Sequence, residues 1–584
     1  MDQRRAPSPG RLWLALLLPP IMVAALALRF PLFTAYPFQD EVAVELNGMV
    51  MAGAGTVHPY TKNWPTLVYF LQVGSARALD LVGLAPSPEE ALVAAAGGEG
   101  FAAAGPYLQL GRALSALYAV AALLFAALLG RRLAGTGAGL WTAALLAAAP
   151  LHVAVSRLAT TDVLCTALVL LSLWLAAEGW VRGGARGWLW GSAFAAGCAA
   201  GAKYTGGLAV VAPLVVVLSA SGPGPLGKGL VRLLPVGAVA LVGFLLAVPG
   251  MVTMPGDYLA GLGHHAGDAR AGWEFFRGVD LPGYLYHPLH TFTWALGGQG
   301  VGGSLVGVAG LVGVVWFCFR RTGARVVLAP FGLVWFLVVG YTEVLYARYW
   351  APFLPLLCLG LAWGVLGVSR RRPLIGHLLL AVALLMTLRG EVSRALALKR
   401  EDTRVEAARR LPTLVPLKAR IATLYPLRAA PEWTARVMDE LAGRDPGQRR
   451  ELVLRAAATD PAALFHLLWD SAYPALDPRL YGLEAVSVKD GGMLLTLEEL
   501  KAAGVTHYLW SAFRDGMVEQ AGPEAFPGRH AFLEKLTALC GEPELVIDPG
   551  GRGSALPLAE EETRTVWAAD ATRPGPLLKL YALP

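Results

Sequence analysis

The hydrophobic positions divide the chain into two unequal parts. Long apolar segments, broken by short polar turns, run from residue 12 to about residue 398. Beyond them charged residues are frequent, apolar runs are short, and Pro and Gly are common. An apolar segment of roughly 20 residues is long enough to cross a bilayer as a helix. The pattern therefore predicts a transmembrane domain, residues 1–395, followed by a soluble domain, residues 396–584, of ordinary single-domain size.

Eleven apolar segments are predicted to be membrane-spanning helices. They are 12–29, 108–130, 137–155, 163–181, 188–203, 205–220, 230–250, 302–319, 326–344, 349–368 and 374–391. A further apolar stretch, 66–84, contains Arg77 and Asp80, whose charges argue against complete burial in lipid. We predict that this stretch is an interfacial or re-entrant helix.

The basic residues between the segments decide the predicted topology. Arg4 and Arg5 precede the first span and indicate an N-terminus on the inside of the membrane. If 66–84 does not cross the membrane, five basic clusters also lie inside, whereas all five would lie outside if it did. The clusters are Arg131-Arg132, Arg182/Arg186, Lys228/Arg232, Arg320-Arg321/Arg325 and Arg370-Arg371-Arg372. The topology predicts a long first external loop, residues 30–107, and an external C-terminal domain.

Composition supports the membrane class and excludes others. The 584 residues are 55% hydrophobic and only 16% charged, a balance that favours a polytopic membrane protein over a soluble one. The net charge of +7 comes from Arg residues at the ends of apolar segments, which is typical of topology signals and does not indicate nucleic-acid binding. The five cysteines are scattered and show neither a disulfide framework nor metal-ligand spacing.

An acidic pair follows the first predicted span. Asp40 and Glu41 open a segment, Asp40 to Ala54, whose apolar residues recur at helical spacing. We predict a helix that lies along the membrane surface. Carboxylates at a membrane boundary are costly unless they face water or a reacting group, which makes the pair a candidate for chemistry. The alternative is that both carboxylates only cap this helix.

Further charged residues are predicted to gather at the external ends of the spans. Arg157 and Asp162 lie in the turn between the spans 137–155 and 163–181, where Asp162 could also cap the following helix. An Arg at that position offers a bidentate grip on a phosphate group. Lys203 and Tyr204 lie in a Gly-rich segment, where the lysine either points into the same mouth or marks a helix end.

The remaining candidates lie in external loops. The loop 253–300 contains His264, His265, His287 and His290, whose spacing matches no compact metal site. We interpret it as a substrate-lining or interfacial loop. Lys62 in the first loop and Arg348-Tyr349 before span 349–368 are assigned to the same external face.

The ordered motifs together resemble a known family. They are Asp40-Glu41, Ser156-Arg157…Asp162, Lys203-Tyr204 and Arg348-Tyr349…Pro352, followed in the tail by Asp402-Thr403-Arg404…Ala407-Ala408, Gly504–Tyr508 and Gly575-Pro576…Tyr581. The set resembles bacterial glycosyltransferase family 39, the protein mannosyltransferase and aminoarabinose transferase group with the GT-C fold. The resemblance covers most of the chain in order. One departure is Trp64-Pro65-Thr66, where the family often has a Pro-Pro step before its interfacial helix.

The resemblance implies a transferase that takes a sugar from a polyprenyl-phosphate donor to an acceptor protein, glycan or lipid. It assigns general-base catalysis to Asp40 with support from Glu41, and the second acidic position to Asp162. It also implies that Arg157, Lys203 and Arg348 bind the donor phosphate. We assign Lys62, His264, His265, Tyr204 and Tyr349 to the substrate lining. No resident cofactor is expected, a divalent cation is left open, and the location implied is the bacterial inner membrane with a periplasmic site.

Two other classes compete with this reading. Charged residues within apolar helices also occur in transporters and flippases, but paired repeats and polar groups near mid-bilayer are not seen in this sequence. The third class is a non-catalytic membrane scaffold with an external binding tail.

The tail itself is predicted to be a small α/β or α+β domain without catalytic motifs, which contacts the acceptor or closes over the site. Its predicted strands are Arg420–Leu424, Thr506–Trp510, Leu545–Ile547 and Leu577–Tyr581, and its predicted helices include 403–411 and 528–539.

Overall fold

The computed structural model describes most of the chain. The described residues are 9–29, 39–60, 64–97, 105–220, 226–271, 281–298, 301–397, 400, 403–415, 419–423, 440–441, 443–472, 484–487, 489–490, 493–494, 496–511, 515–548 and 577–584. Lys62, predicted to line the substrate, lies outside them, as do the tail motif residues Asp402, Gly575 and Pro576. For Asp40 only the backbone is described, as part of a helix.

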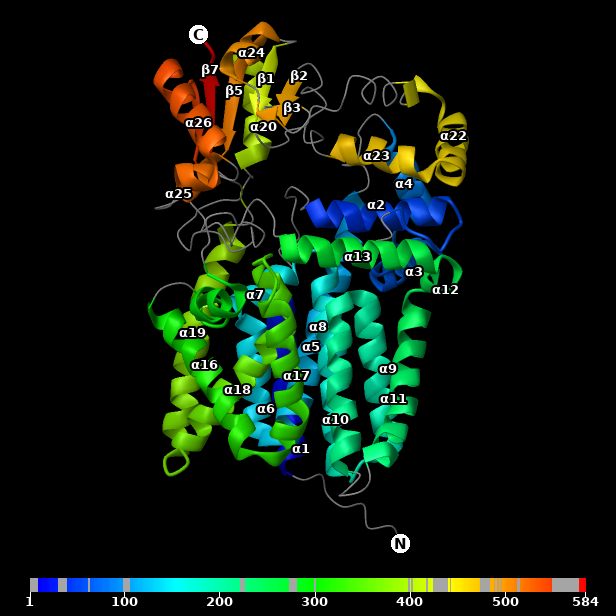
Figure 1. The fold of residues 1–584 in the computed structure, drawn as a ribbon, viewed down its shortest axis with the longest axis vertical. Coiled ribbons are helices and arrows are strands. Elements are labelled where there is room, and N and C mark those ends of the chain that lie inside the picture. The colour runs from blue at the N-terminus through cyan, green and yellow to red at the C-terminus, as the bar shows by residue number, and fades with distance from the viewer. Residues whose placement is uncertain are drawn as a thin grey trace.

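A bundle of apolar helices forms the body of the molecule (Figure 1). Each segment predicted to span the membrane coincides with a helix or with two consecutive helices. They are α1 (Pro9–Arg29), α5 (Gly105–Ala134), α6 (Thr136–Ala148) with α7 (Pro150–Val155), α8 (Thr161–Val181), α9 (Arg186–Ala202), η2 (Tyr204–Val210) with α10 (Val211–Ala220), α11 (Leu226–Ala247), α16 (Val301–Arg320), α17 (Thr322–Gly340), η5 (Ala347–Trp350) with α18 (Leu354–Val368), and α19 (Pro373–Ala397).

Six of these helices are long and apolar enough to cross a membrane: α1, α5, α8, α16, α17 and α19. Four shorter apolar helices accompany them, at 136–148, 204–220, 231–247 and 354–368. The predicted class, a polytopic helical membrane protein, is confirmed. The count of eleven spans stays a prediction.

Small residues let the helices of the bundle approach closely. A Cβ atom at Gly197 of α9 would collide with the Ala240 carbonyl oxygen of α11, and one at Gly313 of α16 would collide with the Gly360 carbonyl oxygen of α18. Between α5 and α6, a Cβ at Gly130 would lie 2.8 Å from the Gly139 Cα. Such contacts are typical of helices packed in a membrane, where van der Waals contact replaces hydrophobic burial as the driving force.

One end of the bundle carries all the remaining elements, and we call it the sheet end (Figure 1). Helix α1 ends there, α8 begins there and α9 ends there, so Arg29, Asp162 and Lys203 lie at the same end. The opposite end, formed by turns such as that between α18 and α19, is called the far end. These charged residues thus share one end of the bundle, and the side of the membrane that this end faces stays a prediction.

The helix that carries the acidic pair is buried within the protein. Helix α2 (Gln39–Gly53) forms and lies across the sheet end (Figure 1), and every residue from Glu41 to Ala52 is buried. Its position along the membrane surface stays a prediction. It packs against α3 (Leu67–Asp80) and α5 on the bundle side, and also against α4 (Pro88–Ala95). On its other side it contacts α22 (Pro446–Thr459) and α23 (Pro461–Ala472) from the C-terminal part. Sequence periodicity within α2 cannot show that α22 and α23, about 400 residues further along the chain, pack on it.

The cover over α2 is apolar. Val42, Leu46 and Met49 of α2 share one core with Leu464 and Leu468 of α23. The ring of Phe465 also lies 4.8 Å from that of Tyr60, centroid to centroid. Because these side chains exclude water from the upper face of α2, the C-terminal helices hold this helix against the bundle.

The loop 253–300 is another correction, since its described residues are mostly helical. Helix α13 (Pro255–Ala271) follows the short α12 (Gly250–Thr253) and lies across the sheet end near α2 (Figure 1). Then come α14 (Gly283–Tyr286), a π-helical turn (His287–Thr291) and α15 (Phe292–Ala295). His264 and His265 thus lie on a helix and not on an irregular loop.

The C-terminal part contains a mixed five-stranded sheet in the order β2-β1-β5-β7-β6. The strands are β1 (Arg420–Thr423), β2 (Glu484–Ser487), β5 (Val505–Ser511), β6 (Leu545–Ile547) and β7 (Leu578–Ala582), and the short β3 (Lys489–Asp490) and β4 (Met493–Leu494) form a separate pair. β1 is parallel to β2 and β5, whereas β7 is antiparallel to β5 and β6. All four predicted strands are found.

Helices cover both faces of this sheet. Ala407 and Leu411 of α20 (Thr403–Leu414) pack on one face with Ile421 and Leu580. On the other face lie α24 (Leu497–Ala502), α25 (Asp515–Ala525) and α26 (Pro527–Cys540), which surround Tyr508. The predicted helices 403–411 and 528–539 correspond to α20 and α26. The division at residue 395 remains our proposal for the domain boundary.

A buried carboxyl group makes this domain sensitive to pH. Tyr508 Oη donates a hydrogen bond to Asp515 Oδ1 over 2.7 Å, and the Ser511 amide donates to Oδ2 over 2.7 Å. Burial outweighs these two bonds and raises the pKa of Asp515 from 3.8 to about 7.

The folded domain therefore retains a proton that the unfolded chain releases between about pH 4 and pH 7. We expect its free energy of unfolding to fall by up to about 4 kcal/mol as the pH rises through this window, and to stay level above it. Pulse proteolysis of the full chain in urea, with fragments from 496–548 detected by mass, measures this fall. Asp515→Asn should abolish the slope, and an unchanged slope in that variant would contradict the assignment.

Candidate functional site

Asp162 is the centre of a charged group at the sheet end. It lies in the first turn of α8, which follows α7 after a tight turn, and its side chain is 4% exposed. Lys203 Nζ lies 2.6 Å from Asp162 Oδ1. Thr160 Oγ1 donates to Asp162 Oδ2 over 3.3 Å. The carboxylate thus holds the lysine in one place. The N-cap residue of α8 is Thr160 and not Asp162.

The local backbone explains how Lys203 reaches this position. It follows the end of α9 in an extended conformation, with φ −153° and ψ 129°, before the 3₁₀ turn η2 begins at Tyr204. A Cβ at Gly206 would collide with the Ala199 carbonyl oxygen, so glycine permits this close reversal. The lysine side chain is 21% exposed, compared with 4% for Asp162, so its ammonium group remains reachable.

Arg348 brings a second cation to the group. It lies in the 3₁₀ turn η5, and its guanidinium carbon lies 5.0 Å from the centre of the Tyr346 ring and 5.8 Å from that of Tyr349. Lys203 Nζ lies 4.0 Å from the centre of the same Tyr349 ring. Both cations therefore share one aromatic wall through cation–π contacts. With one carboxylate between them, Asp162, Lys203 and Arg348 carry a net charge of +1, which favours an anionic ligand.

A buried ion pair ties α2 to this group. Arg112 of α5 donates two hydrogen bonds to Glu41, with Nε–Oε1 and Nη2–Oε2 distances of 2.8 Å each. Both side chains are at most 5% exposed. The Ala159 amide also donates to Glu41 Oε1 over 2.8 Å, three residues before Asp162. The start of α2, and with it the backbone of Asp40, therefore lies beside the turn that carries Asp162.

Two residues of this buried network, Arg112 and Glu45, were not identified from the sequence. Arg112 lies inside the predicted span 108–130, and a charge within an apolar segment is itself a functional signal that could have identified it. Glu45, one helical turn after Glu41, is fully buried and contacts the Gln72 amide of α3. Burial, and then the neighbouring Glu41, raise the pKa of Glu45 well above its usual value.

Arg157 does not join Lys203 and Arg348. It is buried, and its Nε and Nη2 donate to the Leu28 carbonyl over 3.1 and 2.8 Å at the end of α1. Its Nη1 lies 3.8 Å from Glu391 Oε2 of α19. Nearby, Arg29 Nη2 lies 2.7 Å from His152 Nδ1. The three cations predicted to grip the phosphate thus divide into two groups. Lys203 and Arg348 share the Tyr349 ring, whereas Arg157 joins α1, α7 and α19.

The predicted substrate-lining residues are partly brought together. The ring of His265 on α13 lies 6.5 Å from the ring of Tyr204, which directly follows Lys203. His264 is exposed and lies 6.4 Å from His265, ring to ring. Tyr349 contacts Lys203, as described above. Within the described residues, no group of three or more His, Cys, Asp or Glu side chains could hold a metal ion.

One segment of the chain matches a known protein family. Residues 104–249 match the family model of dolichyl-phosphate-mannose-protein mannosyltransferases. That segment contains Arg112, Arg157, Asp162 and Lys203. No curated protein matches the chain.

Solved structures superpose on most of the chain. The oligosaccharyltransferase of Archaeoglobus fulgidus, in complex with Zn and sulfate, superposes with a TM-score of 0.51 at 12% identity, over 89% of this chain and 71% of that one. ArnT from Cupriavidus metallidurans, bound to undecaprenyl phosphate, gives a TM-score of 0.46 at 16% identity, over 80% and 77%. The former likeness establishes the fold. The fold and the family model together define the class: this is an integral membrane protein with the GT-C glycosyltransferase fold, as the motifs predict.

Proposed function

We propose that this protein transfers a sugar from a polyprenyl-phosphate-linked donor to an acceptor hydroxyl group at the sheet end of the bundle. The observation that carries the proposal is the meeting of Lys203, Arg348 and Asp162 beside the start of α2. The family model that matches 104–249 describes an enzyme with a lipid-phosphate sugar donor, which supports the same donor class.

Lys203 and Arg348 suit the leaving group of this reaction. When the bond between the sugar anomeric carbon and the phosphate oxygen breaks, negative charge grows on the phosphate. Lys203 and Arg348 are placed to stabilise that charge, in a site partly shielded from water. Asp162 orients the lysine through their 2.6 Å ion pair. We propose a positioning role for Arg157, which holds the α7–α8 turn against α1 and α19.

The incoming hydroxyl group needs a base, and we propose Asp40 for that role. The acceptor oxygen forms the new bond to the anomeric carbon, and its proton passes to the Asp40 carboxylate. Glu41 supports Asp40 by fixing the start of α2 through Arg112 and the Ala159 amide. Its two oxygens accept three hydrogen bonds there, so it acts through position and does not serve as a second base.

The remaining assignments extend the proposal. We propose that Tyr204, Tyr349, His264, His265 and Lys62 line the path of the substrates. We also propose that residues 396–584 form a domain that covers the site, consistent with the packing of α22 and α23 on α2.

The substrates and the location complete the proposal. The sugar is a hexose or a pentose, and the acceptor is a protein, glycan or lipid. The membrane is the bacterial inner membrane, with the sheet end facing the periplasm.

The base is tested by Asp40→Asn in purified full-length protein. We expect the variant to bind the donor while its turnover falls about 10²–10⁴-fold, the usual contribution of a general base. Mass spectrometry of the polyprenyl phosphate released from a panel of lipid-phosphate sugars measures turnover. Asp80→Asn is the matched control, an exposed carboxylate at the end of α3 in the same loop. Equal turnover in the Asp40 variant and wild type would remove Asp40 from the mechanism.

A further inference from the structure

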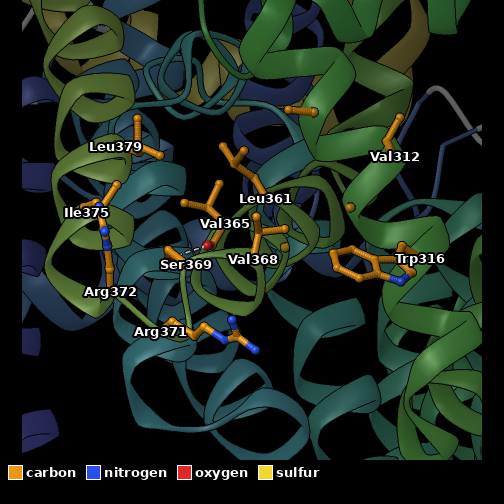
Figure 2. A pocket seen from close by; sticks show the side chains of 13 residues that line it. Val312, Trp316, Leu361, Val365, Val368, Ser369, Arg371, Arg372, Ile375 and Leu379 are labelled. Atoms are coloured by element: carbon orange, nitrogen blue, oxygen red, sulfur yellow. Dashed lines mark hydrogen bonds between the residues drawn. The ribbon is translucent and has the colours of Figure 1, made fainter.

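A groove at the far end of the bundle has walls from three helices. It has a volume of about 580 Å³, within the range of roughly 300–1,000 Å³ found for small-molecule sites. Figure 2 shows its floor, Leu361, Val365 and Val368 of α18, between Trp316 of α16 on one side and Ile375 and Leu379 of α19 on the other. It lies far along the bundle from Asp162 and Lys203, because α18 runs from the sheet end to the far end.

The groove exists because the residues that line one of its sides are small. At Gly313 and Gly360 the backbones of α16 and α18 touch, so the two helices are tightly packed at this level. Ala309 and Gly364 leave the space next to that contact unfilled. A Cβ atom at Gly364 would meet only the Gly313 Cα, at 3.8 Å, so a larger side chain there would project into the groove without a backbone collision.

The length of the groove matches one leaflet of a bilayer. Its floor extends from Leu361 to Ser369, nine residues that rise by roughly 12 Å along the helix. Half of the hydrocarbon core measures roughly 15 Å. An apolar groove of this length, open to the side in a membrane, accommodates an acyl chain, since water cannot fill it there.

Two arginines lie at the end of the groove where the headgroup of a lipid with its acyl chain in the groove would be. Arg371 and Arg372 form the mouth of the groove, in the turn between α18 and α19, and both are exposed. In the described part of the chain neither guanidinium group has an ion pair or a side-chain hydrogen bond, and no acidic residue lines the groove. The hydroxyl group of Ser369 is already committed, since it donates to the Val365 carbonyl over 2.6 Å. The mouth therefore carries two uncompensated positive charges.

We infer that this groove binds one anionic glycerophospholipid from the far-end leaflet, with an acyl chain along α18 and its phosphate at Arg371 and Arg372. Charge complementarity selects the occupant, because a zwitterionic headgroup would bring its own cation to the same two guanidinium groups. The bound lipid would fill the space between α16 and α19 and join them. The site is separate from the proposed donor site and does not depend on the proposed reaction.

The inference is tested by native mass spectrometry of the delipidated, full-length protein titrated with phosphatidylglycerol or phosphatidylcholine of equal chain length. We expect one phosphatidylglycerol to be retained preferentially. The double variant R371Q/R372Q should bind it at least tenfold more weakly, and Gly364→Leu should also lose it. R320Q/R321Q, at the neighbouring far-end turn, and Gly367→Leu, on α18 but outside the groove, should bind as wild type does.

Equal retention of both lipids by wild type would overturn the inference, as would unaltered binding in R371Q/R372Q. Because the two arginines lie on an exposed turn, that variant is expected to fold normally, and it decides the matter even if Gly364→Leu fails to fold. Loss in R371Q/R372Q with full binding in Gly364→Leu would place the lipid on the turn and not in the groove, which also contradicts the inference.

Discussion

Replacement of Lys203 by methionine is expected to reduce the turnover of the lipid-phosphate donor about 10²–10³-fold. Methionine keeps the length of the side chain but removes the ammonium group that we propose stabilises the leaving phosphate, and the loss of one such group typically has this effect. Lys203→Arg should retain much more activity, because the guanidinium group can still reach Asp162 and the phosphate. The rate of polyprenyl phosphate release at saturating donor measures the effect.

A second variant separates this chemical role from a structural one. Lys203→Met leaves the buried Asp162 with less compensation for its charge, which by itself destabilises the fold. The double variant K203M/D162N restores neutrality, so it should unfold at nearly the wild-type temperature while its turnover stays low. Lys501→Met, at an exposed lysine of α24, is the control for loss of a cation. Full turnover in K203M/D162N would refute the proposed role of Lys203.

The Glu41–Arg112 pair is expected to give the largest change in stability. Arg112→Leu should lower the free energy of unfolding by about 3–5 kcal/mol, because it leaves a buried carboxylate without its cation. It should also abolish most transfer activity, since the start of α2 would lose its anchor beside Asp162. Thermal or denaturant unfolding in detergent, with turnover measured in parallel, tests both parts of the prediction.

A double-mutant cycle then isolates the pair. The E41Q/R112L variant contains no buried charge at this position, and its amide oxygen can still accept from the Ala159 amide. Its loss of stability should be smaller than the sum of the two single losses by at least about 2 kcal/mol. Arg77→Leu is the control, since the Arg77–Glu89 pair is 53% and 22% exposed and is expected to contribute less than about 1 kcal/mol. Additive losses in the cycle would show that the two residues are not energetically coupled.

Hydrophobic periodicity was sufficient to locate the helices of the bundle. Each predicted span coincides with a helix because length and apolarity are the properties that a bilayer selects. The positive-inside pattern also placed Asp162, Lys203 and Arg348 at one end, although they are far apart in the sequence. The four strands of the tail were found because their alternating or continuous apolar runs are bounded by turn residues.

The sequence could not reveal which of these charges pair. Arg157 follows one predicted span and Arg348 precedes another, and both lie at the same end of the bundle. Arg157 contacts Leu28 and Glu391. Arg348 instead contacts the rings of Tyr346 and Tyr349. This choice depends on which helices are neighbours, and local patterns contain no such information. The burial of α2 is of the same kind, because α22 and α23 come from the other end of the chain.

The fate of the donor tests the central claim most directly. Full-length protein in sealed proteoliposomes is given a polyprenyl-phosphate sugar labelled differently in its sugar and its phosphate, together with a membrane extract that supplies acceptors. A transferase predicts that the sugar label moves to a new product while an equal amount of labelled polyprenyl phosphate is released, and that Lys203→Met prevents both. Intact donor that has only crossed the bilayer, with both labels still on one molecule, would contradict the account and favour a flippase.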